Sequence, residues 1–437
     1  MKLNKYLNFQ EINGNHYLFN LSNERILYLV PELIRLVKDH AENITELSAI
    51  HPDLYDAMVR DGMITPRDID DTKAFIEREL RAEAESRSFG MTINPTLDCN
   101  MRCWYCYEKH DAARMNADTL ERIVRLIENK AESGTVDRLS VSFFGGEPLL
   151  YFDEVVYPIL SRASVICREA DVALESSFTT NAVLLTKDVL DRINSIEWIK
   201  RPHFQITLDG NREYHNRTRI FADRRPTYDI IFSNMRYALE SGNHVGLRFN
   251  YTDKNIESFI DVYDELMAFP PELHKNLNCN FQQIWQNRQE GVRAKDRSVE
   301  LTAKFQASGL ASECDTIYHR HSCYADNPNH VSINYNGDVF KCTARDYSPE
   351  HREGVLKEDG NIEWNQKYHE RMAIRFSNPA CRKCRVMPLC NGHCTQSKLD
   401  SPTKDRCYMN RSEDDKDRLI HHRLYELVNR RKYVDAE

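Results

Sequence analysis

The run MTINPTLDCNMRCWYC, residues 91–106, joins a strand pattern to three closely spaced cysteines. Residues 91–96 read as a buried β-strand, and Cys99, Cys103 and Cys106 follow at once. Three thiolates at this spacing can ligate three irons of a [4Fe-4S] cluster and leave the fourth iron without a protein ligand. A cofactor that bears amino and carboxylate groups can chelate such an open iron.

The sequence downstream of this run alternates β-rich segments with amphipathic segments, which predicts a parallel sheet covered by helices. Six strands are expected, followed by six helices. We therefore predict an α/β partial (β/α)6 barrel whose chemistry lies at the C-terminal ends of the strands. The predicted strands are 91–96, 139–144, 173–179, 203–208, 245–251 and 278–284; the predicted helices are 116–132, 153–170, 187–196, 228–240, 255–268 and 298–308.

Polar motifs follow three of these strands. Gly145-Gly146-Glu147-Pro148 ends the second strand, and glycines there would let the main chain approach a ligand closely. Asn181 follows the third strand, and Thr207 and Asp209 end the fourth. Asx or Ser/Thr turns that cap the next helix are the alternative interpretation of the last two segments.

The CxxxCxxC spacing with an aromatic residue before its last cysteine, followed one βα unit later by GGEP, resembles the radical S-adenosylmethionine (SAM) superfamily. The resemblance implies that SAM chelates the open iron and that one-electron reduction cleaves it to a 5′-deoxyadenosyl radical. A zinc knuckle or a set of incidental core cysteines is the alternative, but a zinc site would need a fourth ligand. The SAM-binding residues that the resemblance implies are Tyr105, Gly145, Gly146, Glu147, Asn181, Thr207 and Asp209.

A second set of cysteines lies in the last third of the chain. Its spacing, with Gly337 five residues before Cys342, resembles the SPASM domain that some radical SAM enzymes append. The resemblance implies two auxiliary [4Fe-4S] clusters, hence three in all; a pair of zinc sites is the alternative. The first cluster would be held by Cys314, Cys323, Cys342 and Cys394, and the second by Cys381, Cys384, Cys390 and Cys407.

Cys314 is the least constrained of the predicted ligands, because its spacing from Cys323 is loose. If it is free, the first auxiliary cluster would have an open iron able to bind substrate. Cys167 and Cys279 fall in a predicted helix and a predicted strand, where we expect them to be small buried apolar residues.

The first 85 residues predict a separate small α+β domain. Asn13-Gly14 between two apolar runs is a strong hairpin signal, and residues 26–37 and 54–63 are predicted helices. A charged helix over 71–87 leads into the barrel. The chain resembles maturases of ribosomal peptides, and this resemblance implies a winged-helix-like domain that captures a leader peptide by pairing it to a strand edge. A small α+β cap of unrelated purpose is the alternative. The predicted domains are 1–85, 86–312 and 313–437, the last ending in a helix from about residue 412.

Composition narrows the function classes. The 437 residues are 41% apolar and 29% charged, without an apolar run near the roughly 18 residues of a membrane span. No apolar signal-peptide core follows Met1, so a cytoplasmic location is expected and no membrane partner. A net charge of −8 argues against nucleic acid as a partner. Thirteen cysteines in that compartment indicate metal or catalytic sites rather than disulfides.

For the substrate, the resemblance implies a peptide or protein, and for the electron source a low-potential donor of the flavodoxin or ferredoxin type. We favour a maturase that modifies a ribosomally made precursor peptide with a leader. Enzymes that make formylglycine in sulfatases carry an Asp after the second SPASM cysteine; here Thr343 occupies that place, with Asp346 three residues on. Sulfatase maturation and a non-catalytic electron-carrying or peptide-binding protein are the alternatives. His215 and Asp346 are candidate acid-base residues, with a structural hydrogen bond as the other interpretation.

Overall fold

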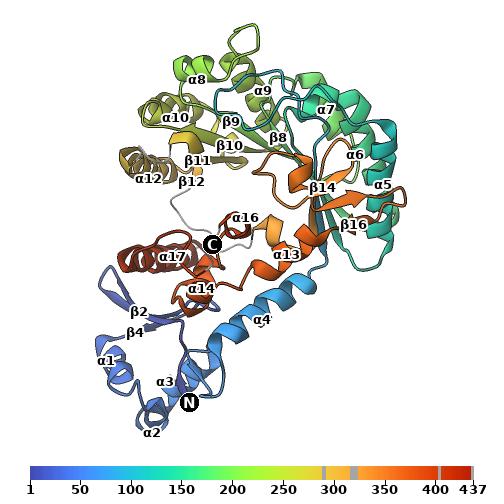
Figure 1. Ribbon diagram of the computed structural model, residues 1–437. Helices are drawn as coiled ribbons and strands as arrows, with labels where there is room; N and C mark the ends of the chain where they lie inside the picture. Colours follow the sequence, from blue (N-terminus) through green and yellow to red (C-terminus); the bar gives the residue numbers. More distant parts are fainter. Residues whose placement is uncertain (288–291, 315–322, 402–404, 435–437) are drawn as a thin grey trace. The chain divides into compact units, whose positions relative to one another are not determined.

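The structure is a computed structural model that describes residues 1–287, 292–314, 323–401 and 405–434 (Figure 1). Contacts group the chain into two compact units. The terminal unit comprises residues 1–85, 318–327 and 370–437, and the barrel unit comprises residues 86–317 and 328–369. The segment 313–437 thus contributes to both units, whereas the sequence-based division treats it as one domain.

The barrel unit is built on a parallel sheet in which neighbouring strands follow one another along the chain, from β6 to β12. All six predicted strands are present, shifted by at most three residues. The seventh, β12, was not predicted. The strands are β6 (Ser88–Ile93), β7 (Arg138–Phe143), β8 (Ala173–Thr180), β9 (His203–Leu208), β10 (His244–Tyr251), β11 (Leu277–Gln283) and β12 (Ala311–Cys314).

Helices follow the strands as the sequence predicts, and Figure 1 shows α5, α6 and α7 along one side of the sheet. A π-helical turn over Phe152–Val156 precedes α6, and the short α8 was not predicted. The helices are α5 (Ala117–Glu132), α6 (Tyr157–Glu169), α7 (Lys187–Asn194), α8 (Arg212–Thr218), α9 (Tyr228–Glu240), α10 (Phe259–Met267), α11 (Pro271–His274) and α12 (Val292–Ala307).

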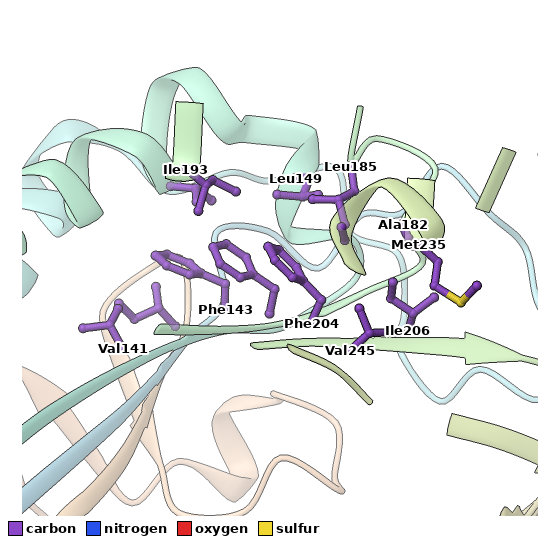
Figure 2. Packing of buried hydrophobic residues seen from close by; sticks show 14 of the residues in the cluster. Val141, Phe143, Leu149, Ala182, Leu185, Ile193, Phe204, Ile206, Met235 and Val245 are labelled. Atoms are coloured by element: carbon purple, nitrogen blue, oxygen red, sulfur yellow. The ribbon is translucent and has the colours of Figure 1, made fainter. Parts of the chain in front are cut away.

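The helix-facing side of the sheet carries the core. Phe143, Phe178 and Phe204, at matching positions of three adjacent strands, stack with ring centroids 5.3 and 5.0 Å apart. Figure 2 shows Phe143 and Phe204 facing Leu149, Leu185 and Ile193. Alternate residues of the same strands are Ser, Thr, Gln, Arg and Asn, so the opposite side of the sheet is polar. Cys167 and Cys279 are fully buried in this core, as predicted.

Short strands extend the sheet beyond β6. β13 pairs with β6 in parallel, with Val331 opposite Met91, and three antiparallel strands complete the edge. None of these four strands was predicted from the sequence. Strands of three or four residues are too short to show a period in the sequence. They are β13 (His330–Ile333), β14 (Asp338–Phe340), β15 (Gly354–Leu356) and β16 (Ile362–Trp364).

In the terminal unit, β2 (Leu7–Ile12) and β3 (Asn15–Asn20) form the predicted hairpin, with Asn13 and Gly14 both at positive φ. The prediction of a helix over residues 26–37 is wrong in its first part. β4 (Arg25–Leu29) pairs with β3, and the helix begins only at Pro31. The other elements here are β1 (Lys2–Leu3), β5 (Ile64–Thr65), α1 (Pro31–Asp39), α2 (Leu47–Ile50), α3 (Pro52–Arg60) and α4 (Asp71–Ala84).

The β2–β3–β4 sheet is covered on both faces. Helices α1 and α3 pack on one face through Ile34 and Met58, together with Leu18 of β3. On the other face, Phe19 of β3 joins a core with Ile420 of α17. Residues 1–85 therefore share a core with the C-terminal segment. The elements of that segment are α13 (Gln366–Ile374), α14 (Pro379–Lys383), α15 (Met387–Cys390), α16 (Thr395–Leu399) and α17 (Glu413–Val434).

Across the described ranges, none of the helices combines the length and the apolar character that a membrane span requires.

Candidate functional site

The cysteine loop, residues 99–106, lies directly after β6. Its backbone folds on itself, with the Cys106 N–H donating to the Cys103 carbonyl at 3.1 Å. The Met101 N–H donates to the Cys99 sulfur at 3.4 Å. Burial, followed by the charge of Glu147, raises the pKa of Cys99 to about 12. Without metal these thiols would keep their protons at neutral pH, and iron binding would release them.

The glycines of the GGEP motif pack by backbone contact against residues 96–98, which lead into the cysteine loop. A Cβ on Gly145 would lie 2.3 Å from the Thr96 carbonyl oxygen, and one on Gly146 would lie 2.0 Å from that of Asp98. The Gly146 N–H donates to Thr96 at 3.2 Å and the Glu147 N–H to Asp98 at 2.8 Å. Only glycine permits this approach. The predicted close approach of these glycines to a ligand stays a prediction; within the chain they contact the segment between β6 and the cysteine loop.

The Glu147 carboxylate is completely buried and joins two strand ends. It accepts hydrogen bonds from the Thr180 hydroxyl at 2.7 Å, the Asn181 N–H at 2.7 Å and the Leu149 N–H at 3.1 Å. Burial raises its pKa, and these bonds oppose the rise. A contact between Glu147 and SAM stays a prediction.

Asn181 connects the end of β8 to the cysteine loop. Its side-chain amide donates to the Asn100 side-chain oxygen at 2.6 Å and contacts the Cys99 sulfur at 3.7 Å. Hydrogen bonds to sulfur are one of the factors that set the potential of an iron-sulfur cluster. The predicted residue thus lies beside a predicted iron ligand.

A buried network gathers on the Tyr105 hydroxyl. Tyr105 donates to Asp209 at 3.0 Å and accepts from Arg219 at 2.9 Å and from Asn250 at 3.0 Å. Burial raises the pKa of Asp209 to about 6, against the opposing charge of Arg219. The second Asp209 oxygen, Oδ2, is buried without a partner in the described part of the chain. It is a ready acceptor for a polar ligand.

Two residues of this network were not predicted from the sequence. Arg219 lies just after α8 and Asn250 lies on β10; neither stands in a motif. Arg219 is only 8% exposed, and its charge opposes the rise in the pKa of Cys103 that burial causes. Thr207, which was predicted, is buried on β9 and pairs in register with Arg248.

His215 has a structural hydrogen-bond role. It is fully buried, its Nδ1 accepts from the Asp209 N–H at 3.4 Å, and its Nε2 contacts the Thr227 hydroxyl at 3.2 Å. Burial, then the charge of Arg219, lowers its pKa well below the ordinary value. The imidazole therefore stays neutral and supports the strand end that carries Asp209.

Asp346 faces the residues that follow the cysteine loop. Its carboxylate contacts the Lys109 ammonium at 3.1 Å and His351 Nδ1 at 2.6 Å. Glu108 is buried nearby, and burial, then the charge of Asp346, raises its pKa to about 8. The Tyr107 hydroxyl donates to the Thr343 carbonyl at 2.8 Å. The cysteine loop is thus fastened to the segment after Cys342.

A second thiol site lies in the terminal unit. The thiol cavity, of about 260 Å³, is lined by all four cysteines of the predicted second auxiliary set. Burial raises the pKa of Cys390 to about 11, and the other three thiolates add to this rise. Four convergent sulfur donors around a cavity suit an iron-sulfur cluster. They are Cys381, Cys384, Cys390 and Cys407.

The first auxiliary set is divided between the units. Cys314, fully buried at the end of β12, and Cys342 belong to the barrel unit, whereas Cys323 and Cys394 belong to the terminal unit. This ligand set stays a prediction. Within the described ranges, no three His, Cys, Asp or Glu side chains are arranged to hold a single metal ion.

The sequence of the barrel unit is similar to that of known proteins. Residues 93–266 match the Radical SAM superfamily. A cysteine-type anaerobic sulfatase-maturating enzyme of Clostridium novyi is 26% identical over 161 residues, which are 34% of this chain and 40% of that enzyme. The radical SAM cyclopropyl synthase TigE of Paramaledivibacter caminithermalis is 22% identical over 75% of this chain and 72% of its own.

Solved structures share the fold. Native anSMEcpe with bound AdoMet superposes with a TM-score of 0.59 at 16% identity, over 78% of this chain and 99% of that one. Streptococcus suis SuiB bound to S-adenosylmethionine gives 0.52 at 16% identity, over 94% and 100%. The chain covers less than half of the sulfatase-maturating relative's length.

Proposed function

We propose that this chain, whose residues 93–266 match the Radical SAM superfamily, is a peptide maturase that cleaves SAM reductively and oxidatively modifies a ribosomally made precursor peptide, most simply by a crosslink. The observation that carries the proposal is the pair of thiol sites in one chain. The cysteine loop lies against the Asp209 network, and the four-thiol cavity is built together with residues 1–85.

The residues of the barrel unit suit the cofactors. A [4Fe-4S] cluster on the thiols of the cysteine loop would supply the electron that cleaves SAM to a 5′-deoxyadenosyl radical. Gly145 and Gly146 pack against the residues just before the loop, and Asn181 donates toward Cys99. The unpartnered Asp209 oxygen would accept a hydrogen bond from a polar group of SAM.

Two auxiliary clusters belong to the same proposal. The thiol cavity offers four sulfur donors to the second cluster. The first would take Cys314, Cys323, Cys342 and Cys394. A chain loaded in this way would carry about twelve irons.

We propose that residues 1–85 bind the leader of the precursor as a winged-helix-like domain. A three-stranded antiparallel sheet followed by helices supports this, and β4 pairs only with β3 among the described strands. An extended peptide can add to such an edge by backbone hydrogen bonds. Tyr28 of β4 is 63% exposed and could contact the leader. A precursor-bound structure of SuiB also matches this fold, with a TM-score of 0.51 at 15% identity.

Sulfatase maturation is the weaker alternative. Asp346 has Lys109 and His351 as partners, and Thr343 stands where that subfamily has its Asp. Oxidation of a sulfatase-type Cys or Ser peptide by the purified enzyme would revive it.

The test is anaerobic co-expression with the short peptides encoded beside this protein, followed by mass spectrometry of each peptide. Loss of two hydrogens from one peptide is the expected result, and tandem fragmentation then finds the linked residues. A variant with Cys99, Cys103 and Cys106 all changed to Ala is the control and should leave the peptide unmodified. Zinc instead of iron in the purified protein, or SAM that stays intact under reduction, would refute the proposal in favour of a non-catalytic protein.

A further inference from the structure

The thiol cavity has an electrostatic character of its own. Three of its lining residues, Lys383, Arg411 and Lys416, carry a positive charge at neutral pH. Among the described lining residues, none is Asp or Glu. Val386 and Met387, both buried, form an apolar part of the wall. Charges at such a wall act through a medium less polarisable than water, so their effect is stronger than on an open surface.

Two further lysines lie behind the wall. Lys398 is only 1% exposed, and its ammonium donates to the Arg375 carbonyl. Gly392 lines the cavity, and a Cβ on it would lie 3.2 Å from the Lys398 ammonium nitrogen. Lys398 therefore lies directly behind the cavity wall.

The other lysine comes from the N-terminal segment. The Lys5 ammonium donates to the Arg382 carbonyl at 2.7 Å and to the Thr72 hydroxyl at 2.8 Å. Arg382 lies between two cavity cysteines in the chain. Residues 1–85 thus reach the peptide segment that carries Cys381 and Cys384.

Carboxylates near these lysines lie outside the cavity wall. Glu413, whose side chain is 69% exposed, pairs with Lys416 at 2.5 Å. Asp71 accepts from the Lys5 backbone N–H at 2.9 Å, and the charge of Asp70 also acts on Lys5. These carboxylates offset part of the positive charge of the lysines, and solvent screens the exposed carboxylates most.

From this arrangement we infer that Lys5, Arg411 and Lys416, with Lys398, raise the reduction potential of a [4Fe-4S] cluster held by the four cavity thiols. Reduction adds one negative charge to the cluster, and fixed cations favour the more negative form. A raised potential suits a cluster that receives an electron. The inference rests on the proposed function only in taking the cavity to hold such a cluster.

The test is a potentiometric titration followed by electron paramagnetic resonance, on the full chain after anaerobic reconstitution. The background carries Ala at positions 99, 103 and 106, which removes the signal of the cysteine loop. Lys5→Gln and Lys416→Gln should each shift a midpoint potential to more negative values, and Lys416→Arg should restore it. Lys73→Gln, an exposed lysine of the same unit, is the matched control and should shift nothing.

The iron content of the purified variants distinguishes failure of the proposed function from failure of the inference about the potential. If changing all four cavity cysteines to Ala removes no iron, the cavity holds no cluster and the proposed function loses its second site. If iron is present and no midpoint moves in the Gln variants, the inference is wrong. Lys5→Gln keeps the test decisive should Lys416→Gln lose iron, because Lys5 does not line the cavity.

Discussion

The three thiols after β6 lie in a loop whose approach, residues 96–98, is in close backbone contact with Gly145 and Gly146, whereas the four thiols of the cavity lie on and around the short helices α14 and α15. Carboxylates accompany the first site: Glu147 and Asp209 act on its thiols, with Arg219 as the opposing cation. The second site, the thiol cavity, is lined by the cations Lys383, Arg411 and Lys416. If both sites hold clusters, we expect these charges to give the loop cluster the lower potential and the cavity cluster the higher.

The largest expected effect comes from Gly146→Ala. Its Cβ would meet the Asp98 carbonyl at 2.0 Å, so the cysteine loop must move. We expect iron content to fall by about four atoms per chain and SAM cleavage to be lost, while the thiol cavity keeps its cluster. Iron analysis and 5′-deoxyadenosine assays measure this. Gly134→Ala, at positive φ but in open space, is the control, and a fully loaded Gly146→Ala would show that the clamp is dispensable.

Next in size is the effect of Asp209→Asn on SAM binding. A hydrogen bond to a charged group is worth about 1.5–3 kcal/mol, so the dissociation constant should rise about ten- to a hundredfold. Because burial raises the pKa of Asp209 to about 6, wild-type affinity should fall as the pH drops from 7 to 5 and the carboxylate gains a proton.

Binding titrations at several pH values check this. The Asn variant should lose the pH dependence, and Asp188→Asn, an exposed carboxylate on α7, should retain it. Equal affinities in wild type and Asp209→Asn at pH 7 would remove Asp209 from the SAM site.

A smaller effect is expected from Tyr28→Asp on the edge strand β4. A charge there should weaken leader binding about tenfold, within the usual range for an interface aromatic residue. SAM cleavage without peptide should stay unchanged. Fluorescence anisotropy of a labelled leader peptide measures the affinity. Tyr425→Asp, an exposed tyrosine on α17, is the matched control, and equal loss in both variants would argue against capture by β4.

The smallest effect is expected from Tyr6→Phe. The Tyr6 hydroxyl contacts Thr72 at 3.0 Å and the Met387 sulfur at 3.8 Å, both within the terminal unit. Loss of a buried hydrogen bond should lower the free energy of unfolding of this unit by about 1 kcal/mol. Urea unfolding followed by the loss of the cavity cluster's absorbance measures it. An unchanged urea midpoint would mean that the Tyr6 contacts of residues 1–85 do not stabilise the cavity.

The sequence predicted the parallel sheet well because its strands are apolar on the helix side and are separated by amphipathic helices. It failed at residues 26–30, where an unbroken apolar run fits helix and strand alike. Pairing with β3 decided the outcome there, and that contact is not local.

For the site, the cysteines of the loop and of the thiol cavity and the GGEP motif could be picked out because their spacing in the sequence is short; their role as iron ligands stays a prediction. Arg219, Asn250 and Lys5 could not be. Each reaches its partners only after the chain has folded: Lys5 lies 377 positions from Arg382, and Asn250 lies 145 from Tyr105. No pattern in the chain links such residues.

Because residues 1–85 share a core with the C-terminal segment, the order of events at the ribosome is constrained. Phe19 and Phe75 can complete their core only after Ile420 has been synthesised. That synthesis takes on the order of tens of seconds at ordinary elongation rates. The barrel can fold during that interval, before the other unit is complete. The cysteine loop is then available for metal loading first. Residues 1–85 stay longest without their C-terminal packing partners, so they would need a chaperone most.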